Sequence, residues 1–193
     1  LLKSKMKMFF LRFSERGKIY KSSNVRNYFE KQILPYFHAS SHFEKILIVG
    51  IANYTQHYPN YFKNKKLIRT IDLDKSQLKF AKKKIHIHDS VENVKKYFDD
   101  ESLDLVLMNG VYGWGLNDEN GLINSLIGIN NILKKDGWLV FGYNRVKKRD
   151  PLSIENGDYF SGFNQEKFRG QHRISLKNNP QKHIFKFYNK TKT

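Results

Sequence analysis

Small and polar residues follow each of four short apolar segments in this chain, and their positions predict one shared pocket. The set comprises Gly50, Ala52 and Tyr54, then Asp72, then Asp89 and Ser90, and finally Asn109, Gly110 and Val111. In an open parallel α/β sheet, ligands bind outside the carboxyl ends of the strands, where such residues gather. An acid at the second strand end, here Asp72, can accept hydrogen bonds from both ribose hydroxyls. The pattern therefore predicts a nucleoside pocket.

Each of these residues also has an ordinary structural explanation. Gly50 can serve as a turn glycine, Asp72 as a second helix cap beside Asp74, and Asp89 and Ser90 as caps of a helix that starts near residue 91. The functional interpretation rests on their combination. The loop after residue 49 has one glycine, whereas a dinucleotide fingerprint needs G-x-G-x-x-G. It therefore favours a nucleoside cofactor without phosphates.

The elements that must position these residues alternate between strand and helix patterns. Strands are predicted at 45–50, 67–72, 85–88, 103–108 and 138–141, and helices at 23–37, 74–84, 91–98 and 119–133. Two alternating segments, 172–176 and 183–188, flank a turn-rich stretch and predict an antiparallel hairpin. On its inner face the helix 74–84 is expected to carry Leu78 and Ala81. The order predicts an α/β domain with a parallel core.

Length and composition set limits on the class of protein. The chain has 193 residues, which predicts a single domain over 1–193. It contains no cysteine, so disulfides and thiolate chemistry are excluded. No stretch of about 18 apolar residues is present, and we expect a cytoplasmic protein without membrane insertion.

The net charge of +17 is concentrated at the two ends of the chain. Residues 1–43 carry nine Lys/Arg against two acids, 44–144 carry fourteen against twelve, and 145–193 carry twelve against four. The charge either reflects a lysine-rich solvated surface or serves an anionic ligand. This divides the domain into a basic helical segment (1–42), a cofactor-binding core (43–144) and an acceptor-side segment with the hairpin (145–193).

The order of these motifs resembles the class I S-adenosylmethionine-dependent methyltransferases. The likeness covers residues 43–142 and is carried by 46–50, 70–74, 88–90, 103–111 and 133–140. The segment 109–116, NGVYGWGL, further resembles a small bacterial subgroup of these enzymes. The resemblance implies a Rossmann-like, mostly parallel seven-stranded sheet with helices on both faces, an antiparallel C-terminal hairpin, and S-adenosylmethionine as cofactor.

The resemblance also implies roles for the pocket residues. Gly50, Ala52 and Tyr54 would pass under the methionine part and Asp72 would hold the ribose. Asp89 and Ser90 would face the adenine, and Asn109, Gly110 and Val111 would flank the methyl donor. The loop departs from the family pattern acid-x-G-x-G-x-G, because Ile48, Ala52 and Tyr54 stand at its acid, second glycine and third glycine.

Methyl transfer is an in-line displacement that needs alignment and, for a protonated acceptor, a base. The catalytic candidates are His57, Tyr112 and His172. Tyr112 and Trp114 can equally be loop packing. His86, His88 and Asp89 have ligand chemistry but no third partner at a convincing spacing, so no metal site is predicted.

Lys18, Lys21, Arg26, Arg145 and 147–149 are the cations expected to hold an acceptor. The leading hypothesis is O-methylation of a small anionic acceptor, such as a phosphorylated or nucleotide-linked glycan precursor. The alternatives are an RNA methyltransferase and a non-catalytic binding protein in which Tyr54 fills a degraded cofactor loop. The oligomeric state is left open.

Overall fold

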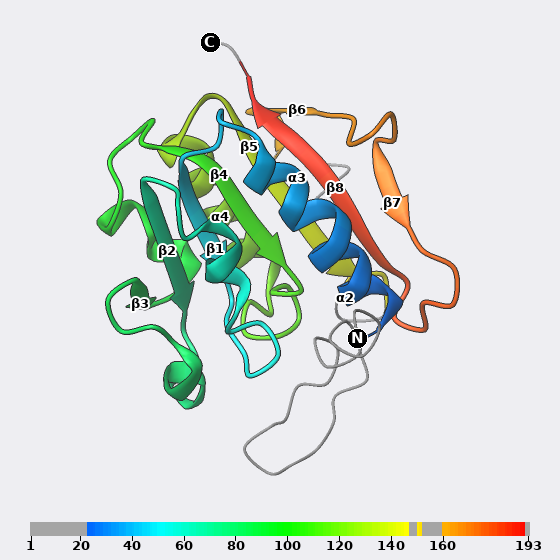
Figure 1. The fold of residues 1–193 in the computed structure, drawn as a ribbon, viewed down its shortest axis with the longest axis horizontal. Helices are drawn as coiled ribbons and strands as arrows, with labels where there is room; N and C mark the ends of the chain where they lie inside the picture. Colours follow the sequence, from blue (N-terminus) through cyan, green and yellow to red (C-terminus); the bar gives the residue numbers. More distant parts are fainter. Residues whose placement is uncertain (1–22, 147–149, 152–159, 192–193) are drawn as a thin grey trace, which may run out of the picture.

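A mixed sheet forms the centre of the domain. The computed structural model describes residues 23–146, 150–151 and 160–191. The strand order is β3-β2-β1-β4-β5-β8-β6, with β7 also paired to β8 (Figure 1). The strands are β1 Lys45–Val49, β2 Leu67–Asp72, β3 His86–His88, β4 Leu103–Asn109, β5 Leu133–Asn144, β6 Phe163–Gln165, β7 Arg173–Ser175 and β8 His183–Lys190. The first five are parallel, and β8 runs antiparallel to β5, β6 and β7.

Because β6 and β7 share the edge of β8, the sheet is seven strands wide. This confirms the predicted Rossmann-like methyltransferase architecture, including the hairpin of β7 and β8. The short strand β6 was not predicted.

Helices cover both faces of the sheet. One layer is a continuous helical segment made of α2 Asn24–Tyr28, the π-helical η1 Phe29–Ile33 and α3 Leu34–Ala39. The other includes α4 Glu119–Ile132. Figure 1 shows α2 and α3 in front of the sheet and α4 behind it. Three 3-10 helices, η2 Tyr58–Phe62, η3 Lys75–Phe80 and η4 Val91–Lys96, lie in the connections.

Strand β1 is apolar on both faces because it separates two cores. Leu47 and Val49 belong to the core that contains α4, while Ile46 and Ile48 belong to the core under α2 and α3. A continuous apolar run is typical of a strand that is covered on both sides. The run ends at Gly50, where the pocket begins.

The N-terminal helix starts where the sequence predicted. The Ser23 side chain accepts a hydrogen bond from the Arg26 backbone N–H at 3.2 Å, and Phe29, Ile33 and Phe37 are buried on the inner face. Pro35 lacks a backbone N–H and its ring would crowd the preceding turn of a regular α-helix. The wider π-helical turn Phe29–Ile33 lies directly before it.

Two predicted helices are shorter than expected. The helix predicted at 74–84 is the 3-10 helix η3, which buries no residue, so Leu78 and Ala81 supply no inner face. The helix predicted at 91–98 ends at Lys96. Without a buried apolar face, η3 gains little from extending an α-helix.

The boundary between α4 and β5 also differs from the prediction. The helix ends at Ile132, and β5 begins at Leu133 rather than Trp138. Leu133 is fully buried and pairs with Leu103 of β4. Tertiary pairing therefore overrides the helical spacing at this position.

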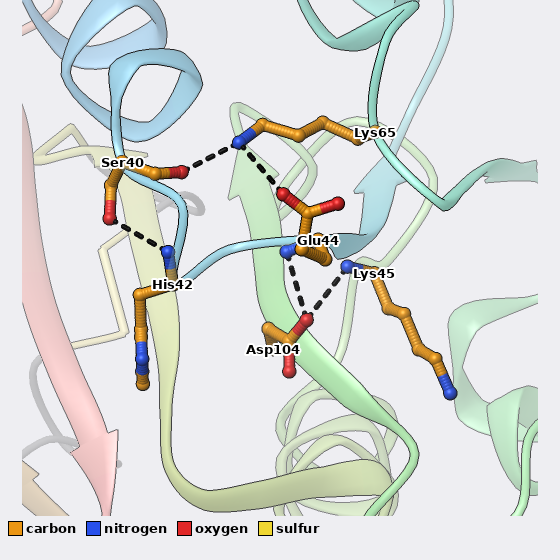
Figure 2. Close-up of polar contacts among 6 residues, drawn as sticks. All are labelled: Ser40, His42, Glu44, Lys45, Lys65 and Asp104. Atoms are coloured by element: carbon orange, nitrogen blue, oxygen red, sulfur yellow. Dashed lines mark hydrogen bonds and ion pairs between the residues drawn. The ribbon is translucent and has the colours of Figure 1, made fainter.

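The amino ends of β1 and β4 are tied together by Asp104. Its Oδ2 accepts the backbone N–H groups of Glu44 and Lys45 at 2.9 and 2.8 Å, and its Oδ1 accepts Lys134 Nζ at 2.6 Å. Figure 2 shows the two backbone contacts, with Lys65 bridging Glu44 and the Ser40 carbonyl nearby. Burial raises the pKa of Asp104, but these donors outweigh it and hold the pKa below its usual range. This clamp lies at the end of the sheet opposite the predicted pocket.

Candidate cofactor and acceptor site

A cavity of about 610 Å³ lies at the carboxyl ends of the parallel strands. Val49, Asp72, Asn109 and Asn144 mark the ends of β1, β2, β4 and β5 in its lining. The start of α2 and residues 178–181, before β8, complete it. Segments far apart in the sequence therefore meet in one hollow, as expected for an open α/β sheet.

Most of the predicted cofactor residues line this cavity. They are Gly50, Ala52, Tyr54, Asp72, Ser90, Asn109, Gly110 and Val111. Asp89 is not among the lining residues. Its carboxylate accepts hydrogen bonds from the Tyr97 hydroxyl, the Asn93 amide and the Ser90 backbone N–H. The bond from Tyr97, followed by that from Asn93, lowers the pKa of Asp89 to about 2. Through these hydrogen bonds, Asp89 stabilises the start of η4.

Asp72 joins the first two loops of the site. Its Oδ2 accepts the Ile51 backbone N–H at 2.7 Å, and its Oδ1 accepts the Asp74 backbone N–H at 2.7 Å. A carboxylate offers about four lone-pair sites, so two acceptor positions remain beyond these bonds. The side chain shapes the loop after β1 and still has capacity for two hydroxyl groups.

The loop after β1 turns at a glycine that the site requires. Gly50 has a φ of +85°, and a Cβ atom there would lie 3.3 Å from Val111 Cγ2 in the loop after β4. The left-handed backbone and the close approach both favour glycine. Further along, the Ala52 backbone N–H donates to Thr55 Oγ1 at 2.8 Å. The loop is thus held by side chains as well as by one glycine.

Tyr54 stands at the edge of the cavity. Its side chain is 39% exposed, and the Arg26 guanidinium carbon lies 4.2 Å from its ring centroid. This is a cation–π contact between the first turn of α2 and the loop after β1. With Tyr54 in this place the cavity stays open, whereas the binding-protein hypothesis expected the ring to fill it.

The sequence of the central part of the chain matches a known protein family. The family described as "Methyltransferase domain" matches residues 49–141. The chain contains a methyltransferase domain. No curated protein matches the chain in a sequence comparison.

Solved structures resemble the chain over most of its length. N-methyltransferase NodS from Bradyrhizobium japonicum, in complex with S-adenosylhomocysteine, has a TM-score of 0.68 and 13% identity, covering 89% of this chain and 90% of its own. A SAM-dependent methyltransferase from Archaeoglobus fulgidus has a TM-score of 0.61 and 13% identity, covering 88% and 95%. An rRNA methylase from Streptococcus thermophilus has a TM-score of 0.58 and 14% identity, covering 83% and 95%. At these identities the likeness establishes the fold.

The lining of the cavity suits S-adenosylmethionine, the cofactor of the matching family. Asp72 offers acceptors for ribose hydroxyls, and Gly50 lets the loop after β1 lie close to Val111 in the loop after β4. Ile51, Ile71 and Val91 add apolar surface for a base. The residues therefore fit an adenosine with a short polar chain.

The three predicted catalytic residues lie outside the cavity lining. His57 Nε2 lies 3.2 Å from Glu30 Oε1, and the ring packs on Tyr58 and Tyr61. Tyr112 belongs to the core, where burial raises the pKa of its hydroxyl. His172 is exposed beside β7. The structure does not bring these side chains together.

A histidine that was not predicted does line the cavity. His183 opens β8, and its Nδ1 and Nε2 lie 2.8 and 2.9 Å from the Oδ1 atoms of Asn144 and Asn109. Burial lowers its pKa to about 4, so the ring is neutral at physiological pH. Since a neutral imidazole carries one N–H, one of the two amides must turn its NH₂ toward the ring.

Gly142 leaves room for the cluster of Asn109, Asn144 and His183. A Cβ atom at Gly142 would lie 2.1 Å from Asn109 Oδ1 and 3.0 Å from His183 Nε2. The ends of β4, β5 and β8 thus build a polar wall of the cavity. The hairpin strand predicted at 183–188 begins at His183, and the antiparallel register of β8 against β5 places this residue opposite Asn144.

The histidines of β3 have local partners. His86 Nδ1 lies 2.8 Å from Thr70 Oγ1, and His88 Nε2 lies 3.1 Å from the Leu73 carbonyl oxygen. Within the part of the chain that the structure describes, no three metal-ligating side chains gather. No helix in that same part is long and apolar enough to cross a membrane.

Proposed function

We propose that this protein transfers the methyl group of S-adenosylmethionine to an oxygen of a small anionic acceptor, such as a phosphorylated or nucleotide-linked glycan precursor. The proposal rests on which segments of the chain form the cavity wall. Residues 23–26, residues 178–181 and His183 line it, and they belong to the two basic blocks of the chain. The excess of Lys and Arg in these two blocks would attract anionic ligands.

The distribution of acids in the cavity supports the same acceptor class. Among the described lining residues, the acids are Asp72 and Asp74, and both lie at the end of β2. The wall formed by Asn109, Asn144 and His183 contains no acid. An anion can therefore approach that wall without facing a carboxylate. Of the cations expected to hold the acceptor, Arg26 lines the cavity and Arg145 pairs with Asp150 at 3.0 Å. Lys18, Lys21 and 147–149 lie outside the described residues.

The polar wall also supports transfer to oxygen. The cofactor supplies an electrophilic methyl on a sulfonium, and the protein aligns the acceptor with it. A hydroxyl acceptor must lose its proton during transfer. The neutral His183 ring has one nitrogen lone pair, and it could take up that proton once the acceptor displaces the amide that donates to it. The other Asn side chain would keep the ring in place.

Methyl transfer can be tested with labelled S-adenosylmethionine and a panel of acceptors. The panel contains a sugar phosphate, a nucleotide-linked sugar, the matching neutral sugar and an RNA transcript. We expect label on the anionic sugars, with the carbon shift of an O-methyl group by NMR. Label on RNA, with a rate that falls steeply as salt rises, would support the RNA alternative instead. No binding of S-adenosylhomocysteine at sub-millimolar concentrations would reject the methyl donor.

Substitution of His183 tests the proposed proton acceptor. We expect His183→Gln to lower the rate of methyl transfer about 100-fold, the lower end of what a positioned base contributes. The affinity for S-adenosylhomocysteine should stay unchanged. Because the pKa of His183 is lowered to about 4, wild-type activity should persist below pH 6 and fall only as the ring protonates near pH 4.

The exposed His38 provides the matched control, since His38→Gln changes the same residue type on the surface of α3. It should leave the rate unchanged. An acid limb near pH 6.5 in the wild-type profile, or full activity in His183→Gln, would exclude His183 as the base.

A further inference from the structure

The loop after β1 has already used several of its backbone donors. The Gly50 N–H donates to the Ile71 carbonyl at 2.8 Å, the Ile51 N–H to Asp72 at 2.7 Å, and the Ala52 N–H to Thr55 at 2.8 Å. Backbone N–H groups of a loop are common partners for an anionic group. These three are unavailable for that purpose, so an anion that lies over this loop needs a donor from another element.

Arg26 is a cation in contact with this loop. Its side chain lines the cavity, and its guanidinium lies over the Tyr54 ring with a 4.2 Å separation to the centroid. Within the described part of the chain, its N–H groups make no hydrogen bond or ion pair with another side chain. The guanidinium carries five donors in a fork that matches a carboxylate. Tyr54 therefore holds an Arg whose guanidinium N–H groups donate to no side chain among residues 23–146, 150–151 and 160–191.

We propose that Arg26 binds the carboxylate of the methionine part of S-adenosylmethionine, and that Tyr54 positions it. The proposal rests on the proposed methyl donor. Because Asp72 binds the Ile51 N–H, a ribose held at Asp72 would lie beside the loop after β1, and Arg26 lines the same cavity over Tyr54 of that loop. Tyr54 stands where the family has its third glycine. The guanidinium of Arg26, stacked on Tyr54, would then donate to the carboxylate in place of the loop N–H groups, which are already engaged.

Two adenosine ligands separate this role from a general effect on the cavity. S-adenosylhomocysteine carries the amino-acid part, whereas 5′-methylthioadenosine lacks it and keeps the base, ribose and sulfur. Both are titrated calorimetrically into the full chain. We expect Arg26→Met to weaken S-adenosylhomocysteine binding about 10- to 100-fold, the range for a lost charge-assisted pair. Binding of 5′-methylthioadenosine should change by less than about twofold, because the neutral ligand has no carboxylate to lose.

Tyr54 offers a matched pair of variants. Tyr54→Phe keeps the aromatic face under Arg26 and should leave both affinities unchanged. Tyr54→Leu removes that face and should weaken S-adenosylhomocysteine selectively, by less than Arg26→Met does, because the charge remains. Retained binding of 5′-methylthioadenosine shows that each variant is folded.

Several results would overturn the assignment. Equal losses for the two ligands in Arg26→Met would make Arg26 a residue that only shapes the cavity. Unchanged affinity for both ligands in Arg26→Met would show that Arg26 does not bind the cofactor carboxylate. Equal wild-type affinities for the two ligands would mean that the carboxylate contributes nothing. If the wild type binds neither ligand, the proposed methyl donor fails together with this assignment, whereas the other outcomes leave the donor intact.

Discussion

Asp72→Ala is expected to weaken S-adenosylhomocysteine and 5′-methylthioadenosine alike, by about 100-fold or roughly 3 kcal/mol. The variant removes the proposed acceptor of the ribose hydroxyls, which both ligands carry. It also removes the acceptor of the Ile51 and Asp74 backbone N–H groups. The loop after β1 then loses its tie to β2. Calorimetric titration of both ligands measures the effect.

Asp72→Asn separates the two contributions. Its one carbonyl oxygen can still accept a hydrogen bond, while its NH₂ group faces a backbone N–H that needs an acceptor. We expect an intermediate loss for both ligands. An unchanged dissociation constant in Asp72→Ala would show that the ribose lies elsewhere. A loss limited to S-adenosylhomocysteine would place Asp72 at the amino-acid end, which Arg26 is proposed to serve.

The strands could be predicted because their buried residues form continuous apolar segments in the sequence. In β1 and β4 almost every residue is apolar, and both strands are covered on two faces. The pocket residues at strand ends follow from that prediction, since parallel strands bring their carboxyl ends to one edge. Gly50, Asp72 and Asn109 line one cavity for this reason.

The helices of the connections could not be predicted with the same accuracy. Leu78 and Ala81 are spaced for a helix, but the segment contacts too little of the core to extend one. At Leu133 the helical spacing continued in the sequence, yet pairing with Leu103 placed the residue in β5. Both differences arise from contacts between segments distant in the chain.

The histidines show where site prediction from sequence reaches its limit. His57 follows the first strand and His172 lies near the hairpin, but neither position in the chain determines which side the ring faces. His183 reaches the cavity through the register of β8 against β5. Gly142, on β5, then allows Asn109 to approach it. That combination depends on three strands, and only the paired sheet reveals it.

The second large effect is expected for stability. Asp104→Ala should lower the free energy of unfolding by about 2–4 kcal/mol, because two part-buried backbone N–H groups, of Glu44 and Lys45, lose their acceptor. Lys134 is 41% exposed, so its ammonium can return to water and adds little to the loss. Figure 2 shows how the two N–H groups converge on one oxygen. Urea unfolding followed by circular dichroism measures the change.

Asp104→Asn is the matched variant. Its carbonyl oxygen can still accept both backbone N–H groups, so we expect it to lose about 1 kcal/mol, chiefly the contact with Lys134. The pKa of Asp104 is lowered in the folded state, so its contribution is complete above the unfolded pKa of about 3.9 and is lost as the pH falls through the folded value. The difference between wild type and Asp104→Asn should therefore disappear in acid. A difference that stays constant to low pH, or equal losses in both variants, would contradict the account. Since the clamp and the cavity lie at opposite ends of the sheet, the folded fraction of either variant should bind S-adenosylhomocysteine as the wild type does.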